Sequence, residues 1–311
     1  MVSIVIPSYN VEPYIARCLD SALRQSHTDI EIVVVDDAST DGSVSVVQKY
    51  QRRHTNIRLL RHDCNRGLMV TRRDGYMAAK GDFVMFLDSD DAMPDNAVHT
   101  LVERQRQTGA DIVMGDLLKI YADGKEQHVA GSLSHDATKT KFMASLLTGD
   151  ITHSLCGKLF RAGLLKDGHL QTFDNLTIAE DGCLLYQLVA KAERIVSQNG
   201  IAYLYYENKA SSSQHAYGAK QIDNLMTAYS VMASAFRPYK ELHEQLERRL
   251  TKVTFTFYFE RVPLSTVRQL LHKHNMTDYG GLKHALKYLG WKDYWFFAKR
   301  FVYVRTMLSN D

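Results

Sequence analysis

Short apolar runs alternate with amphipathic segments along the first hundred residues of the chain. The runs cover residues 2–6, 30–35, 57–60 and 83–87. Apolar residues at helical spacing lie between them, at residues 12–25, after the STDGS sequence and at 68–79. Unbroken apolar runs suit strands that are buried on both faces. Their alternation with helices predicts an α/β fold with a mostly parallel sheet flanked by helices.

The pattern changes after about residue 105. The sequence DIVMGDLLKIYADGKEQHVAG predicts a strand followed by a hairpin that turns at 122–125. We expect helices near 139–148 and 179–195, the second of which leads into a strand through residue 207. From about 219 onward, periodic apolar residues with few Gly or Pro predict a helical C-terminal region. A domain boundary is therefore expected near residue 215.

Composition adds limits to this picture. The chain of 311 residues is 45% hydrophobic and 23% charged, with a net charge of +3. This charge is too weakly positive to indicate a nucleic-acid partner. The four cysteines are scattered without a CxxC pair, which is typical of reduced thiols in a cytoplasmic protein. No apolar run reaches 18 residues, so we expect no transmembrane helix.

Three acids, Asp88, Asp90 and Asp91, follow the apolar run at 83–87. Carboxylates this close repel one another, and a buried one needs a positive partner. Oxygen ligands at a strand end suit a divalent cation whose coordination a phosphate substrate completes. Alternatively, Asp90 and Asp91 cap a helix that begins near Pro94. Because ligands of parallel sheets bind beyond the strand ends, the polar residues after the first, second and fourth strands should converge.

Four motifs occur in order at sensible distances: VSIVIPSYN, EIVVVDDASTDGS, NRGLMVTRRDGYMAAKGDFVMFLDSDD and IAEDG. Together they resemble family 2 glycosyltransferases, which are inverting nucleotide-sugar enzymes of the GT-A fold. The resemblance covers roughly residues 1–215 and departs from the usual pattern at Arg73, where the family commonly has Asn. It implies a nucleotide-binding half at 1–105, an acceptor half at 106–215 and a separate helical region at 216–311.

The resemblance implies roles for the loops after the first two strands. Tyr9 matches the position whose ring lies against the nucleotide base, with Pro7 shaping the loop; packing is the alternative for Tyr9. Asp37 matches the carboxylate that accepts a hydrogen bond from the base, a contact that suits uracil and favours UDP. We expect Ser39 and Asp41 to cap the helix that follows.

Other positions match the family's diphosphate and metal contacts. Arg66 and Arg72 fall where members place a cation near the base or phosphates, although both could instead be surface arginines. Asp88 would reach the ribose or a metal-bound water, and Asp90 would bind Mn²⁺ or Mg²⁺. His215 follows the last predicted strand and could add a further metal ligand, or be an ordinary exposed histidine.

The acceptor side needs a carboxylate that removes the proton from the attacking hydroxyl. Asp181 matches the family's base, with Glu180 as its partner; alternatively, both acids only favour a helix start. Lys158 lies where many members carry a lysine, so it contacts phosphate or acceptor, or else lies at the surface.

The last thirty residues interleave basic and aromatic side chains, including Trp291, Trp295 and Arg300. This pattern predicts a helix on an anionic membrane surface, or one packed on the core or on a second subunit. An enzyme that acts on a polyprenyl-linked glycan would gain from the peripheral membrane location.

We therefore predict a metal-dependent inverting hexosyl- or N-acetylhexosaminyltransferase. It would move a sugar from a nucleotide-diphosphate donor, preferably a UDP-sugar, to a glycan or lipid-linked glycan in surface-polysaccharide synthesis. The rivals are a nucleotidyltransferase, disfavoured because the first strand lacks a glycine-rich phosphate loop after it, and a non-catalytic binding module for sugar nucleotides or lipids.

Overall fold

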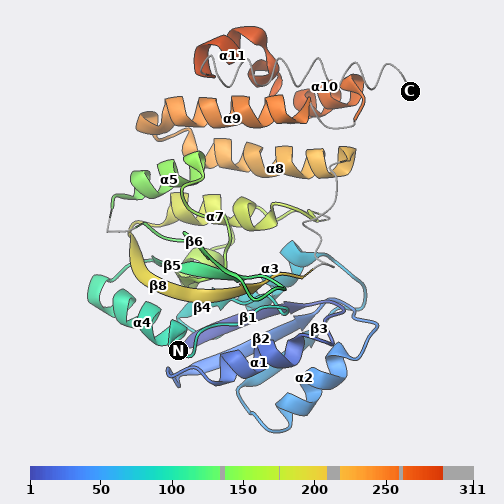
Figure 1. Ribbon diagram of the computed structural model, residues 1–311, viewed down its shortest axis with the longest axis vertical. Helices are drawn as coiled ribbons and strands as arrows, with labels where there is room; N and C mark the ends of the chain where they lie inside the picture. Colours follow the sequence, from blue (N-terminus) through green and yellow to red (C-terminus); the bar gives the residue numbers. More distant parts are fainter. Residues whose placement is uncertain (134–136, 175, 209–217, 259–261, 290–311) are drawn as a thin grey trace.

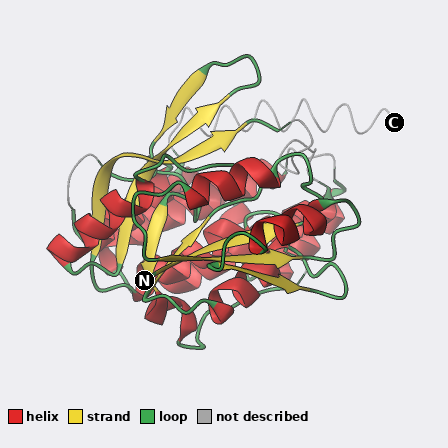
Figure 2. Ribbon diagram, turned by 90° about the horizontal axis from the view of Figure 1, so that it is seen from below, coloured by secondary structure: helices red, strands yellow, loops and turns green. Residues whose placement is uncertain are grey.

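The computed structural model describes residues 1–133, 137–174, 176–208, 218–258 and 262–289. Its centre is a mixed sheet that runs across the molecule (Figure 1). The strands are β1 (Val2–Ser8), β2 (Ile30–Asp36), β3 (Ile57–Arg61), β4 (Phe83–Phe86), β5 (Ile112–Ile120), β6 (Glu126–Val129), β7 (Lys158–Arg161) and β8 (Ile195–Tyr206). Their order is β3-β2-β1-β4-β7-β5-β6, and β8 pairs with β5 outside this path. Figure 2 shows the strands fanning across the molecule, as sheet twist requires.

The first four predicted strands are confirmed, and they pair in parallel. Every residue of β1 and β2 is buried, which explains why their sequences are apolar rather than alternating. β1 runs through Pro7 to Ser8, two residues beyond the apolar run at 2–6. Pairing with β4 ends at Val5, so Pro7 lies where one edge of β1 is open and a proline is tolerated.

Helices cover both faces of the sheet and extend beyond it. They are α1 (Ile15–Leu23), α2 (Ser43–Gln51), α3 (Leu68–Ala78), α4 (Ala97–Thr108), α5 (Lys139–Thr148), α6 (Ala162–Lys166), α7 (Glu180–Lys191), α8 (Ala219–Phe236), α9 (His243–Phe257), α10 (Leu264–Lys273) and α11 (Leu282–Tyr288). In α3, a Cβ on Gly75 would lie 2.4 Å from Val5 Cγ1, so this glycine lets the helix rest directly on β1. Arg72 lies one turn earlier on the same helix face.

The second half of the sheet is antiparallel where β7 enters it. β5 and β6 form the predicted hairpin, in which Tyr121 N–H donates to Lys125 O and Gly124 adopts φ 82°. β7 is four residues long and joins the two halves, because Phe160 pairs with Val84 of β4 and with Ile112 of β5. The sequence pattern assigned no strand here, since four residues are too few to show a period.

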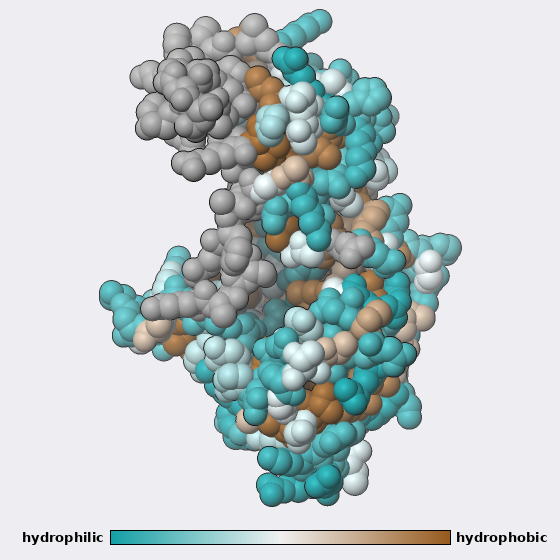
Figure 3. Space-filling model, turned by 90° about the vertical axis from the view of Figure 1, so that its right-hand side faces the viewer, coloured by the Kyte–Doolittle hydropathy of each residue, from teal (hydrophilic) through white to brown (hydrophobic). Residues whose placement is uncertain are grey.

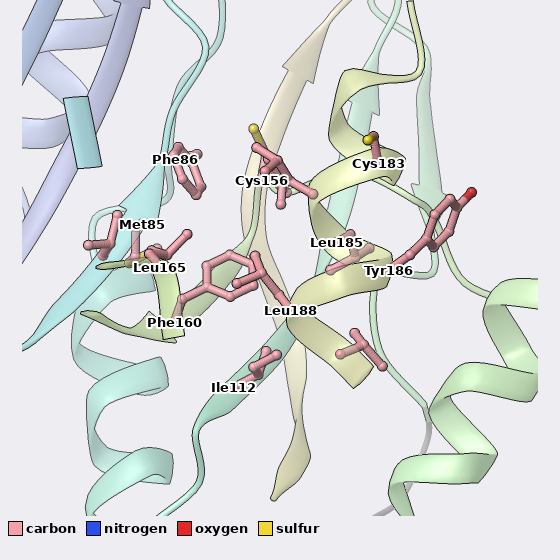
Figure 4. Packing of buried hydrophobic residues seen from close by; sticks show 14 of the residues in the cluster. Met85, Phe86, Ile112, Cys156, Phe160, Leu165, Cys183, Leu185, Tyr186 and Leu188 are labelled. Atoms are coloured by element: carbon pink, nitrogen blue, oxygen red, sulfur yellow. The ribbon is translucent and has the colours of Figure 1, made fainter. Parts of the chain in front are cut away.

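The predicted helical C-terminal region is confirmed for the described residues. α7, α8 and α9 form successive layers beyond the sheet, with α10 and α11 outermost (Figure 1). Figure 4 shows Phe160 from the sheet beside Leu188 of α7, whereas Tyr186 projects from the opposite side of the same helix. Tyr186 in turn packs edge-on against Phe236 of α8, with ring centroids 5.8 Å apart. One continuous set of buried apolar residues therefore runs from β1 into the C-terminal helices.

Part of the predicted tail lies outside the described residues. This applies to Trp291, Trp295 and Arg300, and also to His215 near the expected domain boundary. Among the helices that the structure describes, none combines the length and apolarity needed to cross a bilayer.

Candidate active site

The loops that follow β1 and β2 are joined at the carboxyl end of the sheet. Asn10 N–H donates to Ser39 Oγ at 3.0 Å, and Asn10 Oδ1 accepts from Thr40 N–H at 2.8 Å. Asn10 and Ala38 both have positive φ, a conformation that costs free energy in residues other than glycine. The predicted convergence is therefore observed for the loops after the first two strands, and it includes locally strained backbone.

Arg72 lies at the centre of the polar site. Its Nη2 is 2.7 Å from Asp88 Oδ1, and its Nη1 is 2.5 Å from Asp181 Oδ1. Glu180 Oε1 lies 3.4 Å from the same Nη1. The Arg72 side chain is only 1% exposed, so its charge is compensated by these carboxylates rather than by water.

This arrangement changes the expected charge balance. Arg72 was placed near the base or phosphates with a surface position as the alternative, and the surface alternative is wrong. Burial alone would lower the pKa of Arg72, but Asp181, Asp88 and Glu180 together raise it well above its ordinary value. The positive charge beside Asp88 therefore comes from the chain itself, whereas the acids at this strand end led us to expect a metal ion there.

Glu180 and Asp181 begin α7 after Ala179, which has φ 60°. Asp181 Oδ2 accepts hydrogen bonds from Ser154 Oγ and Leu155 N–H, both at 3.2 Å. Burial raises the pKa of Asp181, and Arg72 opposes this rise. Burial followed by the Asp181 charge raises the pKa of Glu180 to about 6. Asp181 is thus held by several groups, as a positioned proton acceptor must be.

Residues of β8 hold the Asp91 carboxylate and the backbone of Asp88. Tyr203 O–H donates to Asp91 Oδ2 at 2.6 Å and accepts from Asp88 N–H at 3.2 Å. Asp91 Oδ1 also accepts from the backbone N–H of Tyr206. The capping alternative for Asp90 and Asp91 is wrong, because α4 begins at Ala97 and neither carboxylate caps it.

Asp90 is the acid that remains without a strong cationic partner. Its Oδ2 accepts from Asn208 Nδ2 at 3.3 Å, and no Arg or Lys of the described residues forms an ion pair with it. Burial and then the Asp88 charge raise its pKa. A partly buried carboxylate whose charge is so poorly compensated fits a divalent ion. In the described part of the chain, no three His, Cys, Asp or Glu residues form a complete metal site. The remaining ligands would therefore come from diphosphate and water.

Asp37 organises the loop between β3 and α3. Its Oδ1 accepts from Arg66 N–H and its Oδ2 from Gly67 N–H, both at 2.8 Å. Oδ1 also lies 2.7 Å from His62 Nδ1, and Arg66 Nη1 lies 2.8 Å from Asp74 Oδ2. This anchoring was not foreseen, and the contact of Asp37 with a base remains a prediction.

The remaining predicted residues have varied positions. Tyr9 is 47% exposed beyond the end of β1, open to a ligand ring. Asp41 accepts from Ser43 N–H at the start of α2, but the N-cap residue is Gly42, and Ser39 binds Asn10 instead. Lys158 is fully buried, so its surface alternative is wrong. Its Nζ donates to Cys156 O at 3.4 Å, and burial lowers its pKa to about 8.

A cavity of about 310 Å³ opens beside Asp181. Its lining includes Ser154 and His153 from the loop before β7, Tyr186 from α7 and Tyr229 from α8. None of His153, Tyr186 and Tyr229 was singled out from the sequence, because their positions depend on packing between α7 and α8. Asp181 is among the lining residues and Asp88 is not, so the cavity offers a second substrate access to Asp181.

Comparison with known proteins agrees with this geometry. Residues 3–167 match the sequence profile of Glycosyl transferase family 2. The chain belongs to this family. Among curated relatives, it is 30% identical to the uncharacterized glycosyltransferase EpsJ of Bacillus subtilis over 77% of this chain and 70% of that protein. It is 28% identical to a poly(ribitol-phosphate) β-glucosyltransferase of Bacillus spizizenii over 83% of this chain and 40% of that protein.

Solved structures confirm the GT-A-like architecture of this family 2 chain. Residues 1–349 of Staphylococcus aureus TarS, in complex with UDP-GlcNAc, superpose with a TM-score of 0.63 at 21% identity, covering 89% of this chain and 88% of that one. The mannosyltransferase PcManGT of Pyrobaculum calidifontis, in complex with GDP-Man and Mn²⁺, gives 0.58 at 19% identity, covering 97% and 84%. At this identity, the likeness establishes the fold.

Proposed function

We propose that the chain transfers a sugar with inversion from a UDP-sugar to a hydroxyl group of a surface-polymer acceptor, glycan or lipid-linked. The observation that supports this most directly is the pair of carboxylates on one buried guanidinium. Asp88, at the end of β4, and Asp181, at the start of α7, both lie within 2.7 Å of Arg72 nitrogens. Donor-side and acceptor-side acids therefore share one rigid centre, as a single in-line displacement requires.

In this reaction Asp181 accepts the proton of the attacking hydroxyl. Its raised pKa makes it a stronger base than an exposed aspartate, and its hydrogen bonds with Ser154 and Leu155 fix its orientation. Glu180 begins α7 at the positive end of the helix dipole, and burial together with the Asp181 charge raises its pKa to about 6. No covalent intermediate with the chain is needed, because one displacement already inverts the anomeric carbon.

Asp90 would hold Mn²⁺ or Mg²⁺, with the donor diphosphate completing the coordination. When bound, such an ion offsets the charge that develops on the departing nucleotide diphosphate. Asp88 then orients the donor, since Arg72 and Tyr203 O–H fix its carboxylate and its backbone. Tyr9 stacks on the base, and Asp37 accepts from uracil. TarS was solved with UDP-GlcNAc, which supports a UDP-sugar as donor without fixing the sugar.

Release of nucleotide from a panel of donors tests this proposal. UDP-glucose, UDP-GlcNAc, UDP-galactose and GDP-mannose would each be incubated with the protein and Mn²⁺, then with EDTA. We expect metal-dependent release of UDP from at least one UDP-sugar and none after chelation. Failure to release nucleotide from any donor would favour a binding module, and release of pyrophosphate from nucleoside triphosphates would favour a nucleotidyltransferase.

A further inference from the structure

Arg249 lies behind one wall of the cavity beside Asp181, and its charge acts on His153, which lines that cavity. Arg249 of α9 donates from Nη2 to Tyr229 O–H at 3.1 Å, and its guanidinium carbon lies 5.5 Å from the centre of that ring. Tyr229 lines the cavity. Its hydroxyl is neutral, so this contact leaves the Arg249 charge uncompensated.

Arg249 has no carboxylate partner among the described residues, and its Nε is buried without a hydrogen-bond acceptor. An unpaired guanidinium in a partly buried place is costly unless a ligand supplies the anion. Hydrophilic residues cover most of the face shown in Figure 3, whereas Nε of Arg249 is buried. The cost of leaving this guanidinium unpaired is therefore consistent with a role of Arg249 in binding an anionic ligand.

His153 presents a second donor to the same cavity. Its Nδ1 lies 2.7 Å from Tyr186 O–H. Burial raises the pKa of Tyr186 well above its ordinary value, so this hydroxyl keeps its proton and is able to donate it to Nδ1. Burial, followed by the Arg249 and Lys158 charges, lowers the pKa of His153 to about 4. In the tautomer that accepts this proton on Nδ1, the neutral ring carries its own proton on Nε2, which has no partner among the described residues.

We infer that this cavity binds an acidic group of the acceptor, a phosphodiester or a carboxylate, through Arg249 and His153. The inference rests on the proposed function, because it places the acceptor hydroxyl at Asp181 and the acidic group at the far end. Arginine suits both anions, since its planar donors match their oxygens. The rings of Tyr186 and Tyr229 would flank the sugar or polyol between these two ends.

Binding can be measured without knowing the natural acceptor. The histidine ring signals of the full chain would be followed by NMR, with UDP and Mg²⁺ present, and His153 would be assigned from a His153→Gln variant. The probes are methyl glucuronide, glycerophosphoglycerol and methyl glucoside. We expect the His153 signal to shift with at least one acidic probe and not with methyl glucoside; the two acidic probes distinguish carboxylate from phosphodiester recognition. No selective shift with either acid would overturn the inference.

Variants on α9 locate the charge that is responsible. Arg249→Gln should abolish the acid-dependent shift, Arg249→Lys should retain part of it, and Lys252→Gln should leave it intact because Lys252 is exposed on the same helix. UDP release from the donor should be unchanged in all three variants. If Arg249→Gln still shows the full shift, the site lies elsewhere. Loss of donor hydrolysis in the wild-type chain would instead count against the proposed function.

Discussion

Arg72 Nη1 lies 2.5 Å from Asp181 Oδ1, and the side chain of Arg72 is 1% exposed. The same guanidinium contacts Asp88, so the acid after β4 and the acid at the start of α7 depend on one cation. Neither acid can move far without leaving a charge uncompensated in a buried place. The two acids, which the proposed function assigns to the donor and the acceptor, are therefore coupled through a single side chain.

Arg72→Met should destabilise the protein strongly, because three partly buried carboxylates lose their buried cation. Removing one partner from a buried ion pair costs about 3–5 kcal/mol. We expect the free energy of unfolding at pH 7 to fall by this order, and by less at pH 5 because Glu180, with its pKa near 6, is then protonated. Denaturant unfolding of the variant and the wild type at both pH values measures this loss of stability.

The adjacent arginine provides a matched control. Arg73 is 29% exposed and pairs with Asp74, so Arg73→Met should cost less than about 1 kcal/mol. Equal losses in the two variants would show that Arg72 does not have the structural role assigned to it.

Tyr203→Phe should reduce stability by about 1–3 kcal/mol, since Asp88 N–H and Asp91 Oδ2 both lose a buried partner. Tyr206→Phe is the control, because the Tyr206 hydroxyl makes no hydrogen bond among the described residues and its ring still packs under Arg17. Thermal unfolding of the two variants should differ clearly. Similar melting temperatures would mean that the Tyr203 hydroxyl contributes little.

The low pKa of Lys158 predicts that the free energy of unfolding depends on pH. Its pKa is about 8 in the folded protein and 10.5 ordinarily, so between these values the unfolded chain binds the extra proton. This group therefore destabilises the fold as pH falls from about 10.5 to 8, by up to about 3 kcal/mol. Replacing it with an apolar side chain removes that penalty.

The advantage of Lys158→Met over wild type should thus be larger at pH 7.5 than at pH 10. Lys141→Met, at an exposed position, should show no such difference. The comparison requires the free energy of unfolding at several pH values. A pH-independent difference between Lys158→Met and wild type would contradict the assignment of a low pKa to Lys158.

Most of the fold could be predicted from the sequence, because its signals are local. β1 and β2 are seven-residue apolar strands, and the turn at Gly124 carries its own backbone preference. β7 escaped prediction since four residues show no period. Its place between β4 and β5 depends on pairing with strands far away in the chain.

The sequence motifs predicted which acids belong to the site, but they did not predict that Arg72 compensates the charges of these acids. Asp88 and Asp181 were found from their motifs, whereas the contact of Arg72 with both required the packing of α3 on β1 through Gly75. Tyr203 and Arg249 carried no sequence signal at all. A tyrosine in a strand and an arginine in a helix are ordinary until tertiary structure places them beside an acid or a cavity.

The central claim is that Asp181 removes the proton from the attacking hydroxyl. It is tested most directly by Asp181→Asn, which preserves shape while removing basicity. UDP affinity with Mg²⁺, measured by calorimetry, and turnover, measured as UDP released to water or a sugar hydroxyl, should be determined on the same preparation. Asp174→Asn, at an exposed acid before α7, is the control. We predict unchanged UDP affinity with turnover lower by roughly 10²–10⁴-fold. Turnover near the wild-type rate would contradict the account and direct attention to Glu180.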